Sequence, residues 1–221
     1  MKKRRSRRVE FDTWIRILEN VEPRIKILGR GHYSLVVEVN QNLVCKFWIE
    51  DRGYAAYFKF CQEQSSKHLP KFFNPHKLQI MRKNINVVDN TPHIKKSTIA
   101  TVDVKYTVIE KLQPFSLEQL YSSTYLASYL YLVSITNQPN LFIMRQMNKT
   151  KCLKPLLAYH SITTQEQVLN NIDLFGTVTN EWKDLCNLIV ANKPSYAKHD
   201  ITHKNIMLRN DNTLVIIDPW G

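Results

Sequence analysis

Paired cysteines and long apolar runs are both missing from this chain of 221 residues. The four cysteines, Cys45, Cys61, Cys152 and Cys186, form no C-x-x-C pair, so the spacing suggests neither a zinc ribbon nor a disulfide framework and favours a reducing compartment. The apolar stretch 126–135 is far shorter than the roughly 20 residues that span a bilayer. No signal peptide is recognisable, and we expect no membrane-spanning segment.

Acidic residues are also scarce, with 19 against 31 basic residues and a formal charge of +12. Part of the excess lies in the run Lys2-Lys3-Arg4-Arg5, followed by Arg7 and Arg8. Such a run is commonly a solvated arm, and its functional interpretation is contact with a nucleic-acid backbone. The rest of the composition, 43% hydrophobic and 10% aromatic, is that of a globular protein of one or two domains.

The most informative stretch is the last one, KHDITHKNIMLRNDNTLVIIDPWG. It contains Asp200, then Asn205 five residues later and Asp218 thirteen residues after that. The pattern between them predicts a loop, a strand, a turn over 209–212 and a second strand. Two oxygen ligands beside a free carboxylate suit Mg-nucleotide chemistry, because Mg²⁺ completes its shell with phosphates and water. Asp and Asn are also common turn residues, so turn capping is the alternative interpretation.

A second pattern lies near the start of the chain. The segment 25–39 predicts strand, glycine turn and strand, with Gly29, Gly31 and Ser34 in the turn. In a hairpin, such a turn lets backbone N–H groups close over phosphates. The next strand ends its apolar run on Lys46, a residue that is costly to bury unless it meets an anion. An edge-strand lysine facing water is the alternative.

Taken in order, these patterns resemble the protein-kinase-like superfamily. The resemblance implies that Asp200 is the catalytic base, that Asn205 and Asp218 hold Mg²⁺, and that Lys46 pairs with the phosphates of ATP. It implies that strand 106–112 runs into a hinge whose backbone at Glu110 and Leu112 holds the adenine, and it offers Glu63, weakly, as an ion-pair partner of Lys46. The implied ATP contacts are Leu28, Gly29, Gly31, Ser34, Val36, Val44, Lys46, Glu110 and Leu112.

Within that superfamily the chain resembles the early serine/threonine protein kinases of podoviruses, which act in host shutoff. The similarity is carried by Leu28 to Ser34 (L-G-x-G-H-Y-S), Asp200 to Met207 (D-x4-N-I-M) and the pair Asp218-Pro219. It implies a phage protein in the cytoplasm of an infected bacterium that transfers phosphate from ATP to host proteins, and in some cases to itself.

The fold expected from this resemblance is α+β with two lobes. Residues 1–22 would be a basic arm with a short helix, residues 23–112 an antiparallel β-sheet lobe, and residues 113–221 a helical, truncated lobe. The sequence also predicts a helix over 53–64, a loop over 84–96 and one long amphipathic helical stretch over 165–192.

Several departures keep other functions open. The usual D-F-G reads D-P-W-G here. Lys198 stands two residues before Asp200, where the kinase pattern has His, and Thr202 stands two residues after it, where serine/threonine kinases have Lys. The sequence ends at Gly221, before any activation segment. A small-molecule phosphotransferase of the aminoglycoside type and a binding-only pseudokinase are therefore alternatives. A compact zinc site at His199, Asp200 and His203 is a further one.

Overall fold

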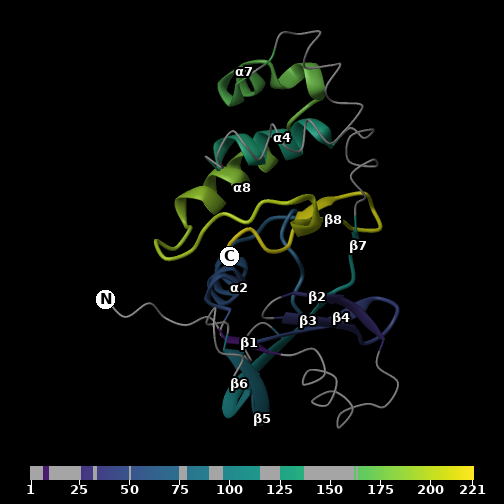
Figure 1. The fold of residues 1–221 in the computed structure, drawn as a ribbon. Helices are drawn as coiled ribbons and strands as arrows, with labels where there is room; N and C mark the ends of the chain where they lie inside the picture. Colours follow the sequence, from purple (N-terminus) through teal and green to yellow (C-terminus); the bar gives the residue numbers. More distant parts are fainter. Residues whose placement is uncertain are drawn as a thin grey trace. The chain divides into compact units, whose positions relative to one another are not determined.

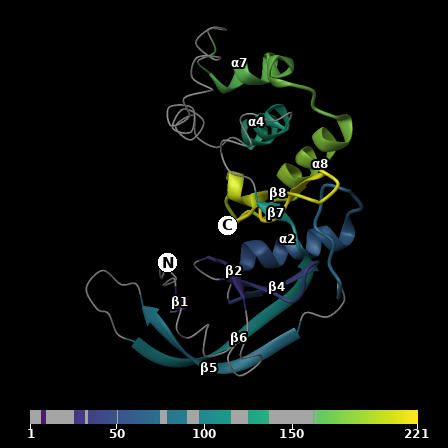
Figure 2. The same ribbon diagram turned by 90° about the vertical axis from the view of Figure 1, so that its right-hand side faces the viewer.

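The computed structural model shows a mixed α+β chain (Figures 1 and 2). It describes residues 7–9, 26–31, 34–49, 51–74, 79–89, 97–114, 125–136, 162 and 164–221. The short helix predicted within residues 1–22 lies outside these ranges. No helix among the described residues has the length and apolar character needed to cross a membrane.

The N-terminal half forms a fully antiparallel sheet of six strands in the order β1-β5-β6-β4-β3-β2. Its strands are β1 (Arg7–Val9), β2 (Ile27–Arg30), β3 (Ser34–Glu38), β4 (Leu43–Trp48), β5 (Gln79–Asp89) and β6 (Ser97–Glu110). The expected loop over 84–96 is wrong in its first part, because residues 84–89 continue β5. A run of alternating polar and β-branched residues there pairs with β6, so the long-range partner overrides the local polarity.

The register of the sheet places three residues in one row: Val36 on β3, Lys46 on β4 and Thr107 on β6. Directly opposed residues project from the same face of a sheet. Lys46 is therefore buried among strand neighbours at 8% exposure, where an apolar residue would be expected. The apolar residues that alternate with it, Cys45 and Phe47, are buried on the other face.

The chain divides into two compact units. The first contains the six-stranded sheet and comprises Met1–Asp51 and Lys71–Lys111; the second comprises Arg52–Pro70 and Leu112–Gly221. The sequence placed residues 52–70 with the first lobe, but by their contacts they cluster with the second. Apolar packing is the reason. Helix α2 (Arg52–Glu63) buries Tyr54, Tyr57 and Phe60, and the rings of Tyr57 and Phe60 contact the ring of Trp220.

The rest of the second unit is helical around a small sheet. Helices α4 (Leu126–Ile135), α7 (Gln165–Asn170) and α8 (Asn180–Ala191) pack together, and β7 (Gln113–Pro114), β8 (Ile206–Leu208) and β9 (Leu214–Ile216) form a three-stranded antiparallel sheet (Figure 1). The core of this unit includes Leu132, Trp182, Ile189, Val215 and Trp220, each at most 2% exposed.

The predicted continuous helical stretch 165–192 is broken in the structure. After α7 and the 3-10 turn Ile172–Phe175, Gly176 has φ 129°, a conformation that residues with a Cβ rarely adopt. The hydroxyl of Thr179 then accepts a hydrogen bond from the Trp182 N–H at 3.3 Å and caps α8. The apolar periodicity runs through the break, which is why the sequence pattern did not reveal it. Leu188, an apolar residue of the predicted stretch, is 41% exposed.

Candidate functional site

The hairpin predicted at the end of the chain is present, and it carries the site. Strands β8 and β9 pair antiparallel, with Ile206 opposite Ile216. The turn between them contains Asn212 at φ 64°, which Asn tolerates better than most residues. A 3-10 turn, His203–Asn205, leads into β8 from the loop that contains Asp200. The local sequence therefore sets the three predicted polar residues on one loop and one hairpin.

Asn205 is bonded directly to Asp200. Its Nδ2 donates to the Asp200 backbone carbonyl at 2.6 Å and to the Asp200 Oδ2 at 3.2 Å. Because the amide nitrogen is used in this way, the Asn205 Oδ1 is the atom left to coordinate a cation. The Asp200 side chain is exposed, so a substrate can reach its carboxylate.

The backbone brings Asp218 to the same place. The Ile217 N–H donates to the Asn205 carbonyl at 2.9 Å, and the Asp200 N–H donates to the Pro219 carbonyl at 2.8 Å. The residues on both sides of Asp218 are thus bonded to the two residues that the sequence paired with it. The structure brings Asp200, Asn205 and Asp218 together within the second unit.

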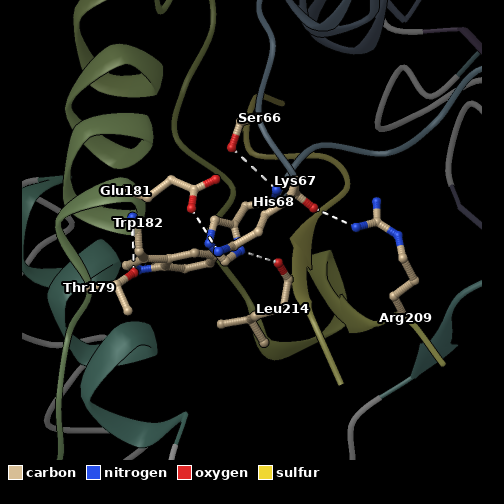
Figure 3. Close-up of polar contacts among 8 residues, drawn as sticks. All are labelled: Ser66, Lys67, His68, Thr179, Glu181, Trp182, Arg209 and Leu214. Atoms are coloured by element: carbon tan, nitrogen blue, oxygen red, sulfur yellow. Dashed lines mark hydrogen bonds and ion pairs between the residues drawn. The ribbon is translucent and has the colours of Figure 1, made fainter. Parts of the chain in front are cut away.

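Residues 67–69, in the Arg52–Pro70 part of the second unit, hold the hairpin in place (Figure 3). His68 donates from Nδ1 to the Leu214 carbonyl at 2.7 Å, and its own carbonyl accepts from the Ile216 N–H at 3.0 Å. Arg209, the residue after β8, donates to the carbonyls of Lys67 and Leu69. These bonds attach residues 67–69 along the hairpin, so the position of Asp218 depends on contacts that the local pattern does not encode.

Two histidines near the hairpin are held neutral. Burial lowers the pKa of His68, whose ring lies edge-on against Trp182 with centroids 5.0 Å apart. Burial, together with the Lys193 ammonium, also lowers the pKa of His199. Among the described residues there is no group of three His, Cys, Asp or Glu side chains placed to hold a metal ion. The zinc alternative also requires the His203 side chain, which lies outside the described part of the chain.

The other predicted residues lie in the first unit. Gly31 closes the glycine turn by donating its N–H to the Ser34 carbonyl at 2.8 Å, and a Cβ on Gly31 would stand 2.9 Å from the Ser34 Oγ. Leu28 is 41% exposed, whereas Val44 and Lys46 are buried and Val36 is half-buried. The Thr107 Oγ1, opposite Lys46 in register, is buried and has no hydrogen-bond partner among the described residues. Sequence reasoning did not single out Thr107.

The predicted hinge is tied to its surroundings. The Glu110 N–H donates to the Lys71 carbonyl at 3.0 Å and is therefore not available to a nucleotide base. Lys111 bonds to Glu38 at 3.1 Å, and Leu112 is half-buried. The ion pair that the structure gives Glu63 is with Lys59, at 3.6 Å on the same helix, and the Glu63 side chain is 58% exposed.

A cavity of about 780 Å³ also lies in the second unit. It borders the contact shown in Figure 3, and its lining includes Lys67, His68, Phe175, Trp182 and Asp211. None of Asp200, Asn205 and Asp218 lines it. This cavity therefore does not include the cluster of predicted residues, and we place the candidate site at the cluster.

No family model and no curated protein matches the chain. Among solved structures there is distant similarity to aminoglycoside phosphotransferases. The streptomycin–ATP ternary complex of APH(2″)-IIa matches with TM-score 0.34 and 14% identity over 96% of this chain and 73% of that one. A GDP complex of an aminoglycoside 2′-phosphotransferase IIIa variant matches with TM-score 0.35 and 15% identity, over 93% of this chain and 70% of that one. The GDP and kanamycin complex of APH(2″)-IIIa matches with TM-score 0.34 and 12% identity, over 94% of this chain and 73% of that one. The roles proposed below rest on the residues of this chain.

Proposed function

We propose that this chain is an ATP-dependent phosphotransferase, with Asp200 as the base that accepts the proton of the acceptor hydroxyl. The observation that carries the proposal is the cluster in the second unit, in which one amide of Asn205 bonds to Asp200 and the residues flanking Asp218 bond to both. A turn-capping role could explain the bonds from Asn205 to Asp200, but it does not explain the bonds of Ile217 and Pro219, which join the loop to the segment around Asp218.

The donor set fits Mg²⁺. Asp218 offers a carboxylate and Asn205 a carbonyl oxygen, while the remaining positions of a magnesium shell are usually filled by phosphates and water. When bound, the ion would neutralise the phosphate charge that develops during transfer. Asp200 has one oxygen oriented by Asn205, which leaves the other to receive the proton from the acceptor. Lys46 and the glycine turn, with Val36, Val44 and Leu112, would bind the ATP.

The acceptor we propose is a serine or threonine hydroxyl on a protein. The proposal is supported by the resemblance of the L-G-x-G-H-Y-S, D-x4-N-I-M and D-P segments to the early kinases of podoviruses. It is also supported by the exposure of Asp200, since an exposed base can be reached by a residue on a protein surface. On this proposal the protein acts on host proteins in the cytoplasm of an infected bacterium.

The test is transfer of labelled γ-phosphate from Mg-ATP to proteins of a bacterial lysate. We expect label on proteins with the wild type and a loss of at least 100-fold in Asp200→Asn, because general-base catalysis contributes about 10²- to 10⁴-fold. Asp184→Asn is the matched control, since Asp184 is an exposed acid on α8 outside the cluster.

Each outcome decides between functions. Label on proteins that disappears only in Asp200→Asn supports the protein kinase. ATP turnover with label on small molecules alone would replace it by a small-molecule phosphotransferase. ATP binding without transfer would leave a binding-only protein, and full activity of Asp200→Asn would remove Asp200 from the role of base.

A further inference from the structure

The segment after Asp218 is fixed on one side by the loop that contains Asp200. Gly221 and Lys198 exchange two backbone hydrogen bonds, at 2.8 and 2.9 Å, and His199 pairs with Trp220 as a β-bridge. Together with the bond from Asp200 to Pro219, this makes a short two-stranded ladder. The ladder fixes the chain immediately C-terminal to Asp218.

The same segment is fixed on its other side by α2. A Cβ added to Gly53 would lie 2.9 Å from the carbonyl carbon of Trp220 and closer still to its oxygen, so the helix backbone lies directly against this peptide. The Trp220 ring is 2% exposed and meets Tyr57 and Phe60 edge-on, at centroid distances of 5.7 and 5.5 Å. Aromatic pairs in this geometry are favourable beyond their buried area.

Tyr57 adds a bond on the N-terminal side of Asp218. Its hydroxyl donates to the Ile216 carbonyl at 2.5 Å, and the side chain is fully buried. Burial raises the pKa of Tyr57 well above its ordinary value, so the hydroxyl stays protonated and remains a donor. With Ile217 bonded to Asn205 and Pro219 to Asp200, the residues on both sides of Asp218 have their backbone bonded to other elements.

We propose that Tyr57 and Trp220 are positioning residues that set the Asp218 carboxylate for a divalent cation, although neither is assigned a contact with cation or nucleotide. The inference rests on the proposed function. Mg²⁺ requires near-ideal octahedral geometry, so a small displacement of one carboxylate ligand weakens binding strongly. Because the restraints act on both sides of Asp218, the position of its carboxylate depends on α2 as well as on the Asp200 loop.

The test is the affinity for Mn²⁺, counted as free ion by electron paramagnetic resonance in the presence of a non-hydrolysable ATP analogue. In Tyr57→Phe the ring and its contact with Trp220 remain and only the donor is lost. We expect the Mn²⁺ dissociation constant to rise about 10- to 100-fold, the range found when groups that orient metal ligands are removed. With Mg-ATP, the Mg²⁺ concentration for half-maximal transfer should rise similarly, while kcat at saturating Mg²⁺ stays near the wild-type value.

The matched control is Tyr54→Phe. It removes the hydroxyl of a tyrosine that is 1% exposed on the same helix, and the bond from Tyr57 to Ile216 remains. A general loss of stability would affect both variants, whereas loss of positioning affects Mn²⁺ binding only in Tyr57→Phe. Equal Mn²⁺ affinity in Tyr57→Phe and wild type would overturn the inference and leave the proposed function standing. Tight Mn²⁺ binding without transfer would overturn the function alone, and a wild type that binds no Mn²⁺ would overturn both.

Discussion

At the scale of single residues, protonation of His68, which holds the hairpin of the candidate site, lowers the stability of the protein at acid pH. The groups that face it are the Leu214 carbonyl, the Trp182 ring, and the charges of Lys67, Glu181 and Arg209. Burial lowers its pKa below the ordinary value of 6.5, so the unfolded chain takes up a proton at a higher pH than the folded one. The contribution of His68 to stability is therefore complete above about pH 6.5 and is lost as the pH falls from there through the lowered pKa of the folded state.

We predict that His68→Asn reduces this acid loss. The Asn side chain retains a donor for the Leu214 carbonyl but does not titrate in this range. Urea unfolding at pH 7.5 and pH 5.5 measures the change: the difference in free energy between the two pH values should be smaller in the variant than in the wild type. It should not vanish, because His199 also has a lowered pKa. An unchanged difference would show that His68 is protonated in the folded state without cost.

At the scale of elements, the contact between α2 and Trp220 reverses the usual effect of replacing glycine by alanine in a helix. Replacing Gly by Ala inside a helix ordinarily stabilises by about 0.5–1 kcal/mol. At Gly53 the added Cβ would meet the Trp220 peptide, which is backbone and is held by the ladder with Lys198. We therefore predict that Gly53→Ala destabilises the protein despite its higher helix propensity, by about 1–3 kcal/mol as for other overpacked sites.

Chemical unfolding measures this effect, and Gly29→Ala is the control, because a Cβ on Gly29 would have no atom within 4 Å. We expect Gly29→Ala to be neutral or slightly stabilising. Equal behaviour of the two variants would mean that α2 can move away from Trp220 at little cost, and it would weaken the inference about Tyr57 as well.

The same elements show what the sequence could predict. The pairing of β8 with β9 and of β2 with β3 is local, and turn residues between apolar runs indicated both hairpins. The hydrogen bond from Tyr57 to Ile216 joins positions 159 apart, and that from His68 to Leu214 joins positions 146 apart. No periodicity reports such contacts. The apolar face of α2 was visible in the sequence, but its partner, Trp220, was visible only as a departure from D-F-G.

At the scale of the whole molecule, the proposed function gives Lys46 the phosphates of ATP and gives Asn205 and Asp218 the metal ion. A ligand that binds only the folded protein stabilises it by about 2.7 kcal/mol when its concentration is 100 times its dissociation constant. We predict that Mg-ATP raises the unfolding midpoint of the wild type, and that chelating the metal with EDTA removes part of this increase.

Two variants separate the contributions of the phosphates and the metal. Lys46→Met retains the length of a buried side chain and removes its charge, so the stabilisation by ATP should be lost with or without Mg²⁺. Asp218→Asn should lose only the Mg²⁺-dependent part, because Lys46 and the glycine turn remain to bind the phosphates. A midpoint that Mg-ATP raises equally in all three proteins would mean that the nucleotide binds elsewhere, and the roles proposed for Lys46 and Asp218 would fail.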